Sequence, residues 1–547
     1  MKPHPVTTSA RWVVLSCLLL LVLGGCGRKQ AATEATTPAA ATAETATHLP
    51  EGITWFDGEV EAAFAAAKAA DKPLFLYWGA EWCPPCAQIK ATIFNQREFQ
   101  ERSRLFVPVY LDGDTPSAQK HGEHFGVVGY PTMILFRADG AEITRLPGGV
   151  DVARYATILD AALADARPVS EILAAARKGE VISQNDWRLL AYHSWGTDAG
   201  RTVPDADRVA TFRLLSSRCP VELEADCARL YFEYLGAAAE ATEAGGKPFS
   251  GLERAEARER LLALLGTPSV LQANVQNLLY GATDVVGLLS DDGSPERGDL
   301  TAGWTKALDM LEGGGAGTEL SAPERLNLIR ARVLVAKLDA PGGPLPPALL
   351  DQARAAVAKE DAETKDGYAR EAAINAAANL YWEAELDKEA NDLLVTELTR
   401  SASPYYFMLA LADLAQKAGR EEEAVQWLAR AYADAKGPAT RFQWGTSYLL
   451  GLLEMTPDDT RRIERAGLEL LGELDDSPDA FYQRTRMRLE QLNTKLLAWG
   501  QDGERAKVIE ALRARAAEIC RGLPEGDDGR RNCEGFLKPA PPATASA

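Results

Sequence analysis

Two cysteines separated by two prolines form the motif in this 547-residue sequence best suited to covalent chemistry. Trp82-Cys83-Pro84-Pro85-Cys86 follows the apolar run 73–78 and precedes a helix-like stretch, 87–101. Cysteines at this spacing can cycle between dithiol and disulfide. A helix N-terminus offers positive potential to a thiolate at Cys83, and Cys86 lies one turn further on. We therefore expect Cys83 to be the nucleophile and Cys86 the resolving cysteine.

A second motif, Gly129-Tyr130-Pro131-Thr132, precedes the strand-like run 133–136. Together the two motifs make residues 51–166 resemble a thioredoxin-fold domain, nearest to the periplasmic domain of the transmembrane thiol:disulfide interchange reductases. The matching positions are Trp55, 59–70, Lys72-Pro73, 80–83, Cys86, Ile93-Phe94, 107–112 and 130–132.

The resemblance implies an α/β fold and protein thiol–disulfide oxidoreductase activity without a cofactor. It also places Pro131 in a cis peptide bond facing the disulfide, which is uncommon enough to be a sharp expectation. Trp82, Glu81 and Tyr130 take supporting roles by the same resemblance.

Two positions depart from the family pattern. Thioredoxins usually bury an Asp where this chain has Tyr77, and the interchange reductases have a Glu where it has Lys90. A buried carboxylate would help to deprotonate Cys86, so the resemblance leaves the route of that proton open. Glu81 and water are the alternatives.

The direction of electron flow is suggested by the two prolines of the motif. Pro84 and Pro85 lack N–H groups in the first helical turn, where donors to Cys83 would otherwise lie. Fewer donors leave the thiolate only moderately stabilised, which favours a reductant or isomerase over a strong oxidant. Because the periplasm is kept oxidising, electrons would come from a membrane thiol reductase.

The N-terminus has the pattern of an export signal. Lys2 and Arg11 are basic, the apolar run 12–23 is too short to span a bilayer comfortably, and Leu23-Gly24-Gly25-Cys26 resembles a bacterial lipobox. We expect residues 1–25 to be a lipoprotein signal peptide and Cys26 to be acylated. A plain secretory signal with an incidental cysteine is the alternative.

These features predict a periplasm-facing protein anchored through lipid to the outer (or inner) membrane of a Gram-negative bacterium. Residues 26–50 are rich in Ala and Thr and poor in bulky apolar side chains, which predicts a disordered linker. The segment 536–547 is interpreted as a disordered tail.

The remaining cysteines fit an oxidising compartment. Of eight cysteines, Cys17 lies in the signal peptide and Cys26 carries lipid. The others fall into sequence-local pairs, and besides Cys83 and Cys86 we expect two structural disulfides. Free buried thiols are the alternative. The two pairs are Cys219/Cys227 and Cys520/Cys533.

The rest of the chain is predicted to be all α-helical, as 170–370 and 371–535. In the second segment Ala378, Ala390 and Pro404 recur 34 positions later as Ala412, Ala424 and Pro438. This is the tetratricopeptide period, so the segment resembles such helix-pair repeats, which build concave surfaces for peptides or partner proteins. An ordinary helical domain with an Ala/Leu core is the alternative.

Composition narrows the function classes. The net charge of −19, from 78 acidic and 59 basic residues, argues against nucleic-acid binding. Neither of the two other cysteine pairs has C-x-x-C spacing or a nearby histidine, and His121 and His124 would need further ligands, so we expect no metal site.

We therefore expect an envelope-anchored oxidoreductase that reduces or isomerises disulfides of periplasmic clients selected by its helical region. The alternative is a helical-repeat scaffold or chaperone-like lipoprotein in which the thioredoxin-like domain has a minor redox role.

Overall fold

The computed structural model describes residues 49–148, 152–165, 167–315, 317, 319–475, 480–501 and 503–538. The expected signal peptide, the acylated Cys26 and nearly all of the linker lie outside them. The expected tail begins too early, because Phe536 and Leu537 are buried and the Leu537 N–H donates to Asn493 Oδ1 at 2.7 Å. Burial of these two apolar side chains is the physical reason that they pack on the helical region.

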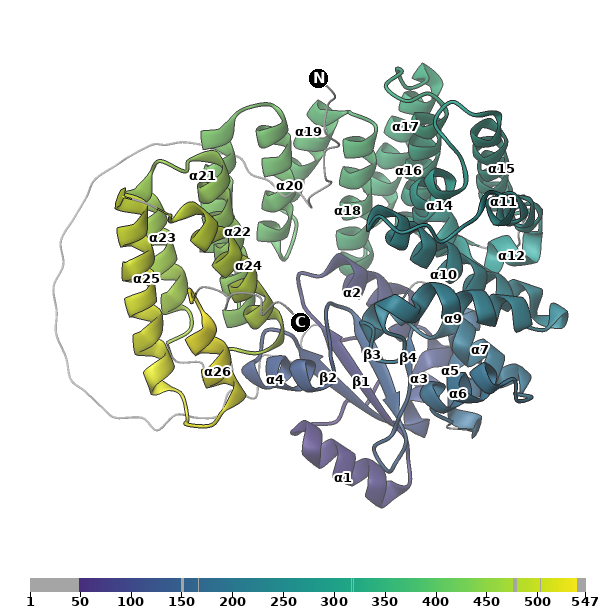
Figure 1. Ribbon diagram of the computed structural model, residues 1–547, viewed down its shortest axis with the longest axis horizontal. Helices are drawn as coiled ribbons and strands as arrows, with labels where there is room; N and C mark the ends of the chain where they lie inside the picture. The colour runs from purple at the N-terminus through teal and green to yellow at the C-terminus, as the bar shows by residue number, and fades with distance from the viewer. Residues whose placement is uncertain are drawn as a thin grey trace, which may run out of the picture.

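A four-stranded sheet forms the centre of the N-terminal part (Figure 1). Its strand order is β2-β1-β3-β4; β1 is parallel to β2 and antiparallel to β3, and β3 is antiparallel to β4. The strands are β1 (Leu74–Gly79), β2 (Val107–Asp112), β3 (Thr132–Phe136) and β4 (Glu142–Leu146). The expected α/β domain is confirmed.

Both faces of this sheet are covered, which explains the unbroken apolar run of β1. Leu76 and Trp78 point to one side, toward Ala63 of α1, whereas Phe75 and Tyr77 point to the other. That second side shares a continuous core with the helical region. The covering elements are α1 (Val60–Ala70), α2 (Pro84–Ile89), the π-helix η1 (Lys90–Phe94), α3 (Arg97–Arg102), the 3₁₀ turn η2 (Ser103–Leu105), α4 (Pro116–His124) and α5 (Val152–Asp165).

The remaining described chain is helical, as expected, and forms an arc around the sheet domain (Figure 1). The first part of the arc consists of α6 (Val169–Lys178), α7 (Gln184–Tyr192), α8 (Trp195–Asp198), α9 (Asp205–Arg218), η3 (Val221–Leu223), α10 (Glu224–Glu243), α11 (Gly251–Leu265), α12 (Pro268–Ala273), α13 (Val275–Tyr280), α14 (Ala282–Leu289), α15 (Pro295–Glu312), α16 (Ala322–Asp339) and α17 (Pro347–Glu363).

The second part of the arc returns to the sheet domain, so that α24 lies beside α4. It consists of α18 (Gly367–Glu383), α19 (Asp387–Glu397), α20 (Pro404–Lys417), α21 (Glu421–Asp434), α22 (Pro438–Met455), α23 (Thr460–Gly472), α24 (Gln483–Trp499), α25 (Gly503–Gly522) and α26 (Asp528–Gly535). No helix of the described residues is long and apolar enough to cross a membrane.

The 34-residue spacing coincides with successive helix pairs. Pro404 and Pro438 begin α20 and α22. Ala390 of α19 and Ala424 of α21 are both buried where the second helix of each pair packs. Small residues at these crossings let two helices approach closely, which is the physical reason for the period.

Each cysteine pair outside the sheet domain forms a disulfide. Cys219 at the end of α9 is joined to Cys227 of α10, with 5.7 Å between the Cα atoms. Cys520 of α25 is joined to Cys533 of α26 at 5.6 Å.

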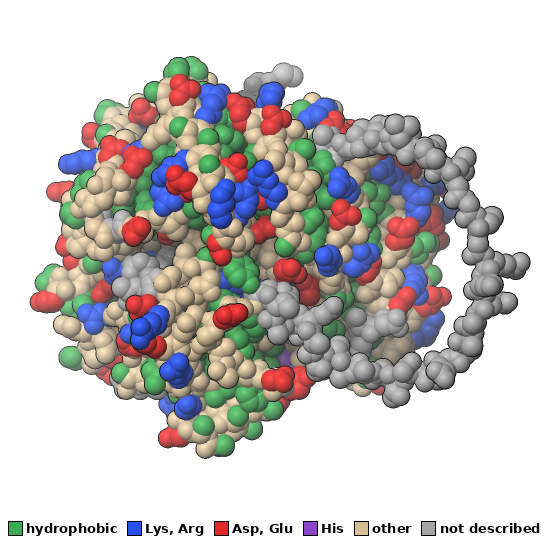
Figure 2. Space-filling view, turned by 180° about the vertical axis from the view of Figure 1, so that it is seen from behind, with side chains coloured by type: hydrophobic (Ala, Val, Ile, Leu, Met, Phe, Trp, Pro, Cys, Tyr) green, Lys and Arg blue, Asp and Glu red, His purple; other side chains and the backbone are tan. Residues whose placement is uncertain are grey.

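Acidic and basic side chains are interspersed on the face shown in Figure 2. Ion pairs also join neighbouring helices, such as Arg325 with the buried Glu360 and Arg370 with the buried Glu397. The negative charge is therefore spread over a mixed surface on this face.

Candidate active site

The cysteine pair lies where β1 turns into α2. Cys83 is the N-cap of α2 and forms a disulfide with Cys86, with 5.2 Å between the Cα atoms. Cys83 Sγ accepts the Cys86 backbone N–H at 3.2 Å. Pro84 and Pro85 fit the first turn because the N–H groups there have no partner within the helix, but they offer no donor to the sulfur.

The expected supporting residues surround this disulfide unequally. The Tyr130–Pro131 peptide bond is cis. Trp82 and Tyr130 pack against the small cluster formed by the two cysteines and Ala80. Glu81 is exposed to solvent.

The helical region covers the redox face of the sheet domain. The Trp82 indole N–H donates to Thr440 Oγ1 of α22 at 2.6 Å. The Trp82 ring also stacks on the Tyr406 ring, with 6.1 Å between the ring centres. It forms an edge-type contact with the Trp444 ring, with 4.9 Å between the ring centres. Cys83 is only 3% exposed as a result. Because exchange requires sulfur to touch sulfur, a protein disulfide cannot reach Cys83 in this arrangement.

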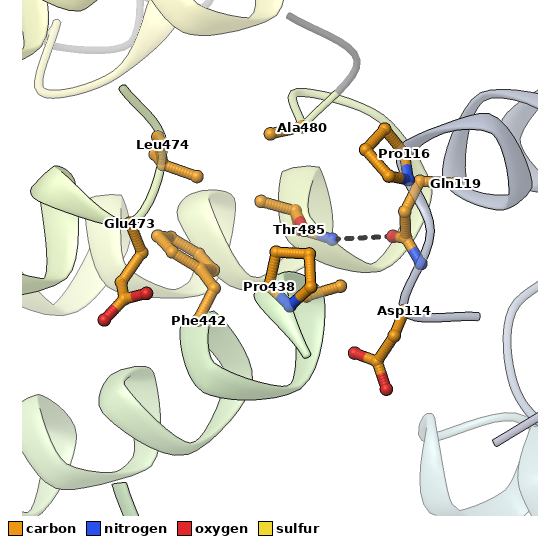
Figure 3. A pocket seen from close by; sticks show the side chains of 10 residues that line it. Asp114, Pro116, Gln119, Pro438, Phe442, Glu473, Leu474, Ala480 and Thr485 are labelled. Atoms are coloured by element: carbon orange, nitrogen blue, oxygen red, sulfur yellow. Dashed lines mark hydrogen bonds between the residues drawn. The ribbon is translucent and has the colours of Figure 1, made fainter. Parts of the chain in front are cut away.

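Asp114, in the turn between β2 and α4, holds the N-terminus of α22. Its carboxylate accepts the Thr440 backbone N–H at 2.6 Å and the Thr440 hydroxyl at 2.7 Å. A helix start leaves N–H groups unpaired and attracts negative charge, so a carboxylate from the other domain acts as its cap. Figure 3 shows the small pocket beside this contact, with Asp114 and Gln119 on one side and Pro438 and Phe442 on the other.

The start of α24 forms the second half of the interface. The Gln483 N–H donates to Glu123 Oε2 at 2.7 Å, and its side-chain amide donates to Val127 O at 2.8 Å. The Tyr130 hydroxyl lies 3.3 Å from Gln483 Oε1. Gln483 has a φ of 42°, which is uncommon for a residue with a side chain. This backbone conformation occurs at the residue that donates hydrogen bonds to both Glu123 and Val127.

The two positions that depart from the family pattern are both buried. Burial raises the pKa of Tyr77 and lowers that of Lys90 to about 8, although Asp112 and Glu81 oppose the second shift. The Lys90 ammonium lies 5.2 Å from the ring centre of Tyr368, which belongs to α18. The helical region therefore also helps to cover Lys90.

Sequence reasoning missed Asp114, Thr440 and Arg484. Arg484 Nη2 donates to Asp114 Oδ1 at 3.3 Å, and Asp114 is more than 300 positions away from both partners. No local pattern distinguishes these residues from ordinary surface residues. An Asp before a helix and a Thr within one carry no signal for a contact between domains.

A family model described as a thioredoxin-like domain matches residues 60–163. Thioredoxin from Pseudomonas aeruginosa is 32% identical over 95 residues, which are 17% of this chain and 81% of that protein. Thiol:disulfide interchange protein DsbD from Neisseria meningitidis is 29% identical over 109 residues, which are 18% of either chain. A solved DsbH oxidoreductase structure is 18% identical with a TM-score of 0.19, over 23% of this chain and 94% of its own. The chain thus spans 18% of the DsbD relative it matches.

Proposed function

Because this chain belongs to the thioredoxin family through residues 60–163, we propose that it is a protein thiol–disulfide oxidoreductase. The observation that carries the proposal is the Cys83–Cys86 disulfide at the start of α2, packed between Trp82 and Tyr130. A fold alone would not specify this chemistry, whereas two sulfurs in this position do.

The reaction proceeds in two exchange steps. The Cys83 thiolate attacks one sulfur of a client disulfide, forming a mixed disulfide and releasing the other client sulfur as a thiolate. Cys86 loses its proton and attacks Cys83 Sγ, which forms the Cys83–Cys86 disulfide and releases the second client thiolate. Two electrons pass to the client, and a dithiol donor must return them.

Reduction or isomerisation is the proposed direction. Cys83 Sγ accepts one backbone N–H, from Cys86, because both residues between them are prolines. This supports a thiolate of moderate stability. We propose a membrane thiol reductase as the donor.

The proposed setting is the cell envelope. The lipobox-like sequence ending at Cys26 supports attachment to a membrane facing the periplasm. We propose further that the helical region selects the client, since it occupies the face through which a client must reach Cys83.

A binding role is the second candidate. The observation that favours it is the cover itself, because a cysteine that is 3% exposed turns over slowly unless the helices move. In that case the chain is a helical scaffold or chaperone-like lipoprotein with a minor redox role.

One experiment separates the two. The full chain without its signal peptide is supplied with dithiothreitol and a protein disulfide, and formation of client thiols is followed against Cys83→Ser. Turnover that depends on Cys83 supports the oxidoreductase. Turnover equal to that of Cys83→Ser refutes it, whether or not client protein binds. Cys86→Ser, which cannot resolve the mixed disulfide, then identifies clients by trapping them on Cys83.

A further inference from the structure

Arg484, at the start of α24, is a buried cation with incomplete pairing. Only 9% of it is exposed. Its Nη2 donates to Gly113 O at 3.2 Å and to Asp114 Oδ1 at 3.3 Å. Nε and Nη1 are buried and have no hydrogen-bond partner among the described residues. Buried guanidinium groups normally have their donors satisfied, so these two require an explanation.

The position of this cation supplies one. The guanidinium carbon lies 5.3 Å from the ring centre of Trp82 and 5.2 Å from that of Tyr130. Both rings pack against the cluster that contains Cys83 and Cys86. Arg484 is therefore placed between the residue before the nucleophile and the residue before the cis proline.

The sulfur of Cys83 has fewer backbone N–H donors than a helix N-terminus usually offers. Its one backbone donor is the Cys86 N–H, since Pro84 and Pro85 have none. In a site shielded from water, a fixed cation acts strongly on a thiolate even without direct contact. Arg484 can thus replace the missing donors of the helix start.

The charges around this site come from several elements, and their balance matters. Asp112 ends β2, Asp114 follows it, Glu81 precedes Trp82, and Lys90 lies in η1. Asp114 offsets part of the charge on Arg484, but its carboxylate also accepts two hydrogen bonds from Thr440. The two unpaired N–H edges of Arg484 remain for a further acceptor.

We propose that Arg484 is a positioning residue of the redox centre, contributed by the helical region, which stabilises negative charge on Cys83 Sγ when the disulfide opens. The inference rests on the proposed function. When a dithiol donor reduces Cys83–Cys86, the S–S bond breaks, two electrons enter, Cys86 takes a proton and Cys83 remains a thiolate beside Arg484. The donor leaves as a disulfide, and its second proton is released to water.

Docking of α24 and reduction of the disulfide are then coupled. If the docked guanidinium favours the dithiol form, the dithiol form must favour docking by the same factor. The reduced enzyme holds its helical region more tightly than the oxidised enzyme does.

The test uses Arg484→Gln in the full chain without its signal peptide. The thiolate of Cys83 is titrated by its ultraviolet absorbance, which needs no access for a reagent, with Cys83→Ser as the blank. We expect the midpoint of this titration to rise by about one pH unit, a typical effect of losing a nearby opposite charge. At a pH above both midpoints, equilibration with glutathione should give a dithiol-to-disulfide ratio about tenfold lower.

Three further variants make the result specific. Arg484→Lys keeps the charge and should restore most of the midpoint. Arg484→Met removes the charge but keeps the aliphatic part of the side chain. It therefore tests the same midpoint shift in a second neutral variant, in case glutamine disturbs α24. Arg486→Gln is the matched control, because Arg486 lies on the same helix and pairs with Glu123 of α4 rather than contacting Trp82. Its midpoint should stay unchanged.

An unchanged midpoint in both neutral Arg484 variants overturns the proposal. An equal shift in Arg486→Gln also overturns it, since loosened docking rather than the guanidinium would then be the cause. The outcome is independent of client turnover. If the Arg484 variants show the expected shifts but the wild-type chain reduces no protein disulfide, the proposed function is refuted and the role of Arg484 stands.

Discussion

The indole N–H of Trp82 meets the hydroxyl of Thr440 at 2.6 Å across 358 positions of sequence. The same hydroxyl donates to Asp114, so one threonine joins the residue beside the nucleophile to the turn after β2. The helical region is consequently attached at the point where a client would have to enter.

Thr440→Val should expose the redox disulfide. The substitution keeps the shape of the side chain but leaves the Trp82 N–H and one Asp114 oxygen without their partner, at a cost of about 1–3 kcal/mol to the closed arrangement. Reduction of Cys83–Cys86 by dithiothreitol should accelerate by roughly fivefold or more. The rate is measured by quenching the reaction at intervals and labelling the free cysteine thiols.

Thr446→Val is the control for that experiment. Thr446 is buried in the same helix, but its hydroxyl donates to Phe442 O within α22. Its reduction rate should match the wild type. Equal rates for Thr440→Val and wild type would mean that the helices already open freely.

Lys90 should make stability depend on pH. Its folded pKa of about 8 lies below the ordinary 10.5 because of burial, so between these values the unfolded chain binds more protons. The free energy of unfolding therefore rises with pH across this window, and the penalty is fully present below about pH 8, up to roughly 3 kcal/mol.

Lys90→Met should remove that dependence. Both proteins are unfolded in urea with their disulfides intact, at pH values below and above the window. The free energy of unfolding of the wild type should increase relative to that of the variant as pH rises. Lys495→Met, which replaces an exposed lysine of α24, should follow the wild type. A constant difference between wild type and Lys90→Met would contradict the buried charge.

Ala424→Trp should destabilise the helix pairs. Ala424 is fully buried in α21, and extra volume in a packed core costs about 1–3 kcal/mol. The melting temperature of the helical region should fall, as followed by circular dichroism. Gln426→Trp, at an exposed position of the same helix, should have little effect. An unaltered melting temperature for Ala424→Trp would show that this crossing is loosely packed.

Cys26→Ser should abolish membrane attachment. Without the acylated sulfur the chain should appear as a soluble periplasmic form or remain unprocessed, which fractionation of cells distinguishes. Membrane association that persists in the variant would refute the lipobox interpretation.

The elements that sequence predicted best are those specified locally. Cys83 and Pro131 each lie in short motifs next to a strand, and the proline positions of α20 and α22 repeat because each pair solves the same packing problem. Lys90 was visible as a departure from the family pattern, but its contact with Tyr368 was not. Contacts between distant segments depend on how the whole helical arc folds back onto the sheet domain. The identities of single residues such as Asp114 and Arg484 do not predict that arrangement.

The buried Cys520–Cys533 disulfide of the helical region matters because a chain that cleaves disulfides could also attack copies of itself. Cys520 and Cys533 are 4% and 2% exposed, whereas Cys219 of the other structural disulfide is only partly buried. A thiolate must touch the sulfur it attacks, so neighbouring copies of this protein cannot readily cleave the Cys520–Cys533 bond. Burial thus protects this bond from the chain's own chemistry, and the covered Cys83 gives the reactive disulfide the same protection.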